Sequence, residues 1–173
     1  MPAAHELYVA KALGMQKRIS GIDLEGEHAQ VEVKFRLLDP AGRHPKKWVV
    51  VNHQKEYSNE SNGQPTYWCL GFYRLAKPVA SLPHNLKSVE RLEQIVTERI
   101  MHLVSWDWMK QFPPHYTSGR TQLTEWENIL LYARADCLPK ISHTFQTPKG
   151  PMHLTEGVDL KHFPELRKYK KVA

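Results

Sequence analysis

One stretch of strict alternation limits what this chain can fold into. Over residues 31–37, every second side chain is apolar, and the residues between are Glu32, Lys34 and Arg36. Because successive side chains of a strand point to opposite faces, this pattern predicts a half-buried strand over residues 30–38. A second strand is expected over residues 19–24. The polar turn Glu25-Gly26-Glu27-His28 would join the two strands into a hairpin.

The remaining segments predict a mixed arrangement of helices and strands. Helical spacing of apolar residues predicts helices over 3–18, 86–111 and 121–138. Residues 66–76 are apolar on both faces, which predicts a strand in the centre of a sheet, whereas residues 46–58 suit a strand or a helix equally. We therefore expect one α/β or α+β domain over residues 1–173, with a central mixed β-sheet flanked by helices. Its C-terminal segment, 139–173, looks basic and irregular, with room for one hairpin.

Composition limits where in the cell the protein is expected and which class of protein it belongs to. Hydrophobic residues make up 41% of the 173 residues, and no apolar run approaches the roughly 20 residues that cross a bilayer, so no membrane partner is expected. His5 and Glu6 interrupt any signal-peptide core near the start. Two distant cysteines, Cys69 and Cys137, could pair or stay free, and they form no disulfide framework. A cytoplasmic location is the expectation.

The charge balance favours a polyanionic partner. The formal net charge is +6, from 24 Lys and Arg against 18 Asp and Glu. A solvated basic tail is as good an explanation as phosphate contact for the densest cluster, residues 167–171. If the partner is DNA, the residues expected to contact its phosphates are Arg36, Arg120, Lys149, Arg167, Lys168, Lys170 and Lys171.

The predicted hairpin also brings together residues that suit phosphodiester chemistry. Glu32 and Lys34 leave the same face of their strand, and Asp23 falls roughly opposite Glu32 across the turn. Two carboxylates can hold a hard cation such as Mg²⁺ or Mn²⁺, with the Val33 carbonyl as a further ligand. Such a metal polarises a phosphoryl oxygen and lowers the pKa of bound water, and a nearby lysine can orient that water.

The pattern Asp23, then Glu32-Val33-Lys34, resembles the active-site motif of the PD-(D/E)XK nuclease superfamily. The leading helix, hairpin and further strand are also similar to small type II restriction endonucleases and Holliday-junction resolvases. The resemblance implies a restriction-endonuclease-like fold, Mg²⁺-dependent cleavage of DNA, and Glu6 as an additional acid on the leading helix. Because duplex DNA has two antiparallel strands, it also implies a homodimer.

The chain departs from the family pattern at two points. The proline that gives the motif its name is absent, since Gly21-Ile22 precedes Asp23. A Gln-x-x-x-Tyr element found in some members is one residue short here, at Gln54 and Tyr57.

Three alternatives compete with the nuclease interpretation. Glu32 and Lys34 are ordinary cross-strand neighbours on a solvated face, and Asp159-Leu160-Lys161 repeats the same spacing, with Asp136 as a distant upstream acid. A non-catalytic nucleic-acid-binding module would use sheet aromatics as stacking platforms, with Trp48, Tyr67 and Tyr73 as candidates. An assembly protein of a phage or mobile element would need no nucleic acid at all.

Overall fold

The computed structural model describes residues 2–18, 22–38, 47–52, 64–77, 89–113, 115–120 and 125–172. The helices and short 3₁₀ helices are α1 (Pro2–Leu13), α3 (Val89–Ile95), α4 (Trp106–Met109), η3 (Ala135–Cys137), η4 (Leu160–His162) and η5 (Pro164–Lys168). The strands are β1 (Gln16–Lys17), β2 (Leu24–Glu25), β3 (Gln30–Leu37), β4 (Lys47–Asn52), β5 (Thr66–Leu75), β6 (Val96–Ser105), β7 (His115–Arg120), β8 (Glu125–Arg134), β9 (Ile141–Thr147), β10 (Gly150–Thr155) and β11 (Lys170–Val172).

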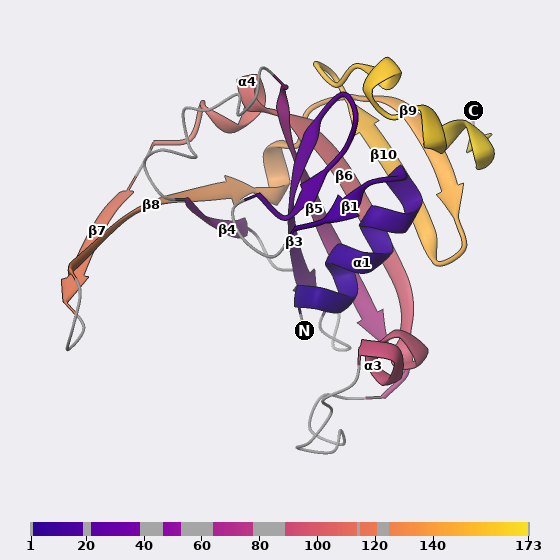
Figure 1. Cartoon of the computed structure of the whole chain (residues 1–173), viewed down its shortest axis with the longest axis horizontal. Helices are drawn as coiled ribbons and strands as arrows, with labels where there is room; N and C mark the ends of the chain where they lie inside the picture. The colour runs from indigo at the N-terminus through magenta and orange to yellow at the C-terminus, as the bar shows by residue number, and fades with distance from the viewer. Residues whose placement is uncertain are drawn as a thin grey trace.

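An eight-stranded mixed sheet forms the centre of the molecule, in the order β1-β2-β3-β5-β6-β10-β9-β11. The β3–β5 and β6–β10 pairs are parallel, and the other neighbouring pairs are antiparallel. A second sheet, in the order β4-β8-β7, extends away from this body as an arm (Figure 1). The fold is therefore mixed α+β around a central mixed sheet, as expected.

Each face of the large sheet has its own hydrophobic cluster. Helix α1 covers one face, where Val9 and Leu13 pack against Val31 and Leu103, and Leu166 of η5 completes the cluster (Figure 1). The other face packs against α4 and the root of the second sheet through a separate cluster that includes Trp68, Leu70, Val104, Trp108 and Trp48. Strands β5 and β6 lie in the middle of the sheet, and β5 is buried on both faces over most of its length.

Helix α1 ends at Leu13, before the end of the helix predicted over residues 3–18. Gly14 has a φ of 65°, in the left-handed region that a helix C-terminus favours and that glycine adopts without strain. The amide N–H of Met15 donates to the carbonyl of Ala10 across this turn at 2.8 Å. The chain then runs into β1, which lies inside the range 3–18 that was predicted to be helical.

Several predicted elements are confirmed. Strand β3 matches the alternating segment, and β5 is central with neighbours on both sides. A hairpin between β2 and β3 forms in the register Leu24↔Val31 and Glu25↔Gln30. Its first strand is shorter than predicted: of residues 19–24 only Leu24 belongs to β2, Glu25 of the predicted turn joins it, and residues 19–21 lie outside the described residues. Strand β4 resolves the ambiguous segment in favour of a strand over its described residues.

The helix predicted over residues 86–111 is wrong for most of its length. Within the described residues 89–111, only α3 and the single turn α4 are helical, and β6 lies between them; residues 86–88 lie outside the described part of the chain. Met101 and Leu103 are buried on one face of β6, and on the other face Val104 is buried while Ile100 is half-buried against the second cluster. A strand between two neighbours reads as an apolar run, which periodicity alone does not separate from a buried helix.

The helix predicted over residues 121–138 is also wrong. Residues 125–134 form β8, which pairs with β4 on one side and β7 on the other. Pairing on both sides supplies the backbone hydrogen bonds that a helix would have supplied internally. Ala135 to Cys137 add only a 3₁₀ turn.

The C-terminal segment 139–173 is regular rather than irregular. It forms the β9–β10 hairpin, two 3₁₀ helices and β11, and Phe163 and Leu166 are fully buried. The cysteines are both free, with Cys69 buried and Cys137 exposed. Among the described residues, no helix is long and apolar enough to cross a membrane.

A glycine in the sheet centre provides a test of this packing. Phe35 lies opposite Gly71 in the β3–β5 register, and its ring stacks on His5 of α1 with centroids 4.5 Å apart. A Cβ atom on Gly71 would lie 2.3 Å from Cε1 of Phe35. Gly71→Ala is therefore expected to lower the free energy of unfolding by about 1–3 kcal/mol, measured by urea denaturation.

The double variant Gly71→Ala with Phe35→Leu separates steric conflict from other effects. Removing the ring should make the alanine less damaging than it is in the native background. Equal losses in both backgrounds would show that the Phe35 ring is not what excludes the methyl group.

Candidate functional site

Asp23 and Glu32 interlock where β2 diverges from β3. The two strands pair only at residues 24–25 and 30–31. Beyond that point, the N–H of Asp23 donates to Oε1 of Glu32 at 3.0 Å, and the N–H of Val33 donates to Oδ2 of Asp23 at 2.9 Å. Each carboxylate therefore takes the place of a backbone acceptor in the ladder, which fixes both acids beside each other.

Lys34 lies on the same side of β3 as Glu32. Its Nζ atom is 3.7 Å from Oε2 of Glu32, and the two side chains are 32% and 11% exposed. The carboxylate is thus largely shielded, while the ammonium group reaches solvent. This ion pair places the positive charge of Lys34 next to the negative charge of Glu32 at the edge of the hairpin.

Helix α1 brings a third acid, Glu6, close to Asp23. Burial raises the pKa of Glu6, and the neighbouring charge of Asp23 raises it further. Lys17 of β1 acts in the opposite direction, with its Nζ 3.3 Å from Oε2 of Glu6. The pKa of Glu6 is therefore raised first by burial and second by the nearby carboxylate of Asp23.

The donor atoms of this cluster are oxygens, which suit a hard cation such as Mg²⁺. Asp23 and Glu32 converge as a pair, whereas Glu6 is held by Lys17. Among the described residues, no three Asp, Glu, His or Cys side chains are arranged closely enough to hold a metal ion. A metal site at Asp23 and Glu32 therefore stays a prediction, as does the Val33 carbonyl as a further ligand.

Asp23, Glu32, Glu6 and Lys34 were predicted from the sequence, whereas Lys17, which pairs with Glu6, was not. The region containing Lys17 was expected to be helical, and in a continued helix nothing would pair it with Glu6. Strand β1 instead folds back beside β2, in the register Lys17↔Leu24. The turn at Gly14 is the one sequence signal that marked this change of direction.

The predicted phosphate-binding residues do not gather in one place. Arg36 is exposed and follows Lys34 on the same side of β3. Lys170 and Lys171 lie on β11, at the opposite edge of the large sheet from β2. Arg120 belongs to β7, in the second sheet.

Two further basic residues are engaged in ion pairs. Lys149 is 2.9 Å from Oε1 of Glu93, and Lys168 pairs with Glu165. Arg167 is exposed in η5. The basic C-terminal residues are thus spread over η5 and β11 rather than placed beside Asp23.

The second Asp-x-Lys motif has a structural explanation. Oδ1 of Asp159 accepts from the N–H of Lys161 at 2.9 Å, which caps the short helix η4. The upstream acid Asp136 pairs with Arg134 at 2.6 Å. Capping accounts for Asp159 without any catalytic role.

The prediction of an aromatic stacking platform is wrong, because the three candidate rings are buried. Trp48, Tyr67 and Tyr73 are 0%, 4% and 7% exposed. Trp48 donates from Nε1 to the carbonyl of Gly71, and Tyr67 bonds Nδ1 of His162 through its hydroxyl. Their ring faces are therefore occupied by the core and closed to nucleic-acid bases.

Comparison with known proteins adds no family assignment. No family model, no curated protein and no solved structure matches this chain. The likeness to PD-(D/E)XK nucleases therefore depends on Asp23, Glu32, Lys34 and their geometry.

The crowding of charge around Glu6 can be measured directly. Asp23→Asn removes the like charge and is expected to lower the pKa of Glu6, whereas Lys17→Met removes the cation and is expected to raise it. A ¹³C NMR titration of the glutamate carboxyl carbons reports both changes. If the two variants moved the pKa of Glu6 in the same direction, Asp23 and Lys17 would not act on it as opposing charges.

Proposed function

We propose that this protein is a metal-dependent DNA endonuclease of the PD-(D/E)XK type, with a restriction-endonuclease-like core. The interlocked pair Asp23 and Glu32, with Lys34 at 3.7 Å from Glu32, supports this proposal most strongly. A solvated strand face would leave such side chains exposed and independent. Here, Glu32 is largely buried and bonded to the backbone across the hairpin.

Each of these residues has its own role in phosphodiester hydrolysis. Asp23 and Glu32 would hold Mg²⁺, or Mn²⁺, with the carbonyl of Val33 as a further ligand. When bound, the metal stabilises negative charge on the phosphoryl group and lowers the pKa of water. Lys34 orients the attacking water and stabilises the developing charge on the phosphate.

Glu6 and Lys17 act around this pair. The raised pKa of Glu6 makes it a proton acceptor better matched to near-neutral pH than an ordinary carboxyl group. Lys17 keeps the ionised form accessible by pairing with it at 3.3 Å. Arg36 extends the basic side of β3 toward the phosphate backbone, and cleavage of both strands calls for a homodimer.

The decisive variants lie in the motif itself. Glu32→Ala and Lys34→Ala are each expected to slow metal-dependent nicking and linearisation of supercoiled plasmid by ~100-fold or more, because each removes charge stabilisation at the reacting phosphate. The measurement is a time course with Mg²⁺ or Mn²⁺, with circular dichroism to confirm that the variants stay folded.

The chain contains its own control motif. Lys161→Ala changes the lysine of the second Asp-x-Lys sequence and should cut at the native rate. A native protein that cuts no plasmid, junction or RNA substrate would contradict the proposal, as would equal losses in Lys161→Ala and Lys34→Ala. DNA binding without cleavage would instead favour a non-catalytic binding module.

Salt dependence tests where DNA lies. In the uncleaving Glu32→Ala background, the slope of log affinity against log salt concentration should fall by about 1 on Arg36→Gln, if Arg36 contacts one phosphate. Fluorescence anisotropy with a labelled duplex gives the slope, and Lys161→Ala again serves as the control. Affinity that does not weaken with salt would argue against phosphate contacts altogether.

A further inference from the structure

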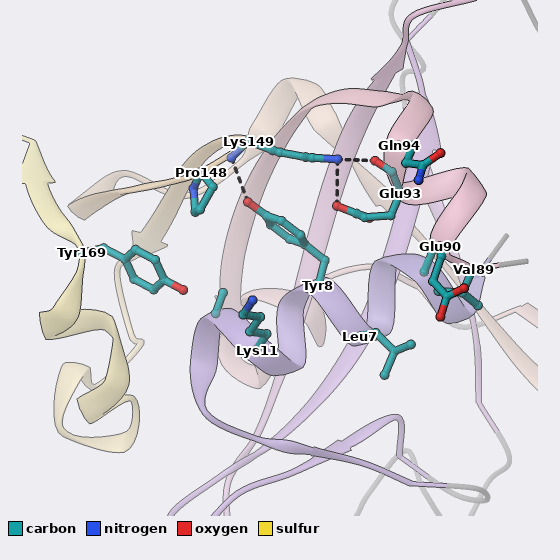
Figure 2. Close-up of a pocket in the computed structure, with 12 residues that line it drawn as sticks. Leu7, Tyr8, Lys11, Val89, Glu90, Glu93, Gln94, Pro148, Lys149 and Tyr169 are labelled. Carbon is teal, nitrogen blue, oxygen red and sulfur yellow. Dashed lines mark hydrogen bonds and ion pairs between the residues drawn. The ribbon is translucent and has the colours of Figure 1, made fainter.

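A cavity of about 560 Å³ lies between α1, α3, the β9–β10 turn and Tyr169 (Figure 2). This volume is within the range of small-molecule sites in proteins. Apolar groups dominate its lining, including Leu7, Pro148 and the tyrosine rings of Tyr8 and Tyr169. Leu7 is 45% exposed, so a large apolar side chain stands open to solvent at the cavity.

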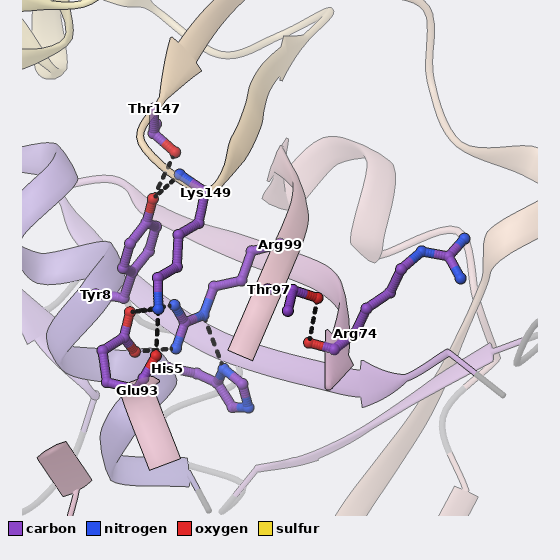
Figure 3. Close-up of polar contacts among 8 residues, drawn as sticks. All are labelled: His5, Tyr8, Arg74, Glu93, Thr97, Arg99, Thr147 and Lys149. Carbon is purple, nitrogen blue, oxygen red and sulfur yellow. Dashed lines mark hydrogen bonds and ion pairs between the residues drawn. The ribbon is translucent and has the colours of Figure 1, made fainter. Parts of the chain in front are cut away.

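The aromatic wall at Tyr8 is held rigidly. Its hydroxyl group lies 2.7 Å from Oγ1 of Thr147 and accepts from the N–H of Lys149 at 2.9 Å (Figure 3). The guanidinium carbon of Arg99 lies 4.2 Å from the centre of the ring. A ring fixed at its hydroxyl and on one face is a preformed surface, which reduces the entropy lost on binding a ligand.

A buried charge network lies behind this wall. Arg99 is fully buried and donates to Glu93 through two nitrogens, at 2.8 and 2.6 Å (Figure 3). Lys149 also contacts Glu93, through both its carboxylate and its carbonyl. His5 accepts from Nε of Arg99 at 3.1 Å, and burial together with Arg99 lowers its pKa to about 3, so His5 adds no charge at neutral pH.

The charges around the cavity, with Arg99 included, do not cancel. Arg99 and Lys149 share one carboxylate, that of Glu93, so the network keeps a net positive charge. Lys11, which is exposed, and Glu90 also line the cavity, so the four lining charges cancel, and the excess positive charge is that of Arg99, which is buried behind the Tyr8 ring. Figure 2 shows Lys11 between the two tyrosines. The cavity therefore has apolar and aromatic walls, with one excess positive charge buried behind them.

We propose that this cavity binds a small amphipathic organic anion. Its flat apolar body would lie between Tyr8 and Tyr169, and its carboxylate, sulfonate or phosphate group would face Lys11. Charge complementarity favours this ligand class over a cationic one, because a cation would meet Lys11 beside the two rings and the excess charge of Arg99 behind Tyr8. The proposal is independent of cleavage at Asp23 and Glu32.

Two fluorescent probes of one shape isolate the role of charge. 8-Anilinonaphthalene-1-sulfonate carries the anionic group, and N-phenyl-1-naphthylamine has the same ring system without it. We expect one anilinonaphthalene sulfonate per chain in a fluorescence titration of the full-length protein. Lys11→Gln should weaken the anionic probe roughly three- to tenfold and change the neutral probe by less than about twofold.

Matched variants keep the result interpretable. Lys140→Gln removes an exposed lysine from the segment before β9 and should change neither probe. Tyr169→Ala and Leu7→Gln remove parts of the wall and should weaken both, and Leu7→Gln is placed where the native side chain is already exposed. Unchanged thermal midpoints would show that the variants stay folded.

Three results would overturn the proposal. These are the absence of saturable binding, equal effects of Lys11→Gln and Lys140→Gln on the anionic probe, and equal effects of Lys11→Gln on both probes. Sedimentation velocity at the same protein concentrations tests whether the protein self-associates. A probe stoichiometry that falls as the protein self-associates would show that a second copy covers the cavity, and would contradict a small-molecule site.

Discussion

The parallel pairing of β3 with β5 is the constraint on which the rest of the structure depends. Parallel neighbours cannot be joined by a tight turn, so the chain must leave the sheet after β3 and return before β5. Within that connection, β4 joins the second sheet, and its Trp48 hydrogen-bonds back to Gly71 in β5. The same pairing sets Phe35 over Gly71, where its ring meets His5 of α1. The register of this one strand pair therefore determines how the large sheet, helix α1 and strand β4 of the second sheet are placed.

Backbone bonding is what gives the acid pair its fixed geometry. Where β2 and β3 separate, Asp23 and Glu32 each accept a hydrogen bond from a main-chain N–H of the opposite segment. Carboxylates held by the backbone lose little further freedom on meeting a ligand, which is the main requirement of a preorganised site. Glu6 of α1 lies close to Asp23 and pairs with Lys17 of β1, so four short segments near the N-terminus build the whole cluster.

Local sequence patterns predicted the elements in which one face is apolar and the other is polar. Strand β3 alternates because one face packs under α1 while Glu32, Lys34 and Arg36 occupy the other, and its hairpin placed Asp23 opposite Glu32. The predictions were wrong at β6, where the apolar residues at positions 96, 100, 103 and 104 suit a helix as well as a strand, and at β8, whose strand state depends on pairing with β4 and β7. The position of Lys17 depends on a turn after Gly14, and the spread of the basic residues over η5 and β11 depends on sheet order, which no local pattern encodes.

The two outermost strands of the large sheet have a consequence for self-association. Strand β1 has only two residues and β11 only three, all of them exposed, and each strand carries lysine. Short, charged borders of this kind discourage a second chain from continuing the ladder of hydrogen bonds. A two-fold assembly of this protein would therefore join through a face of the body or through the arm of β4, β7 and β8, and the sheet itself would end within each subunit.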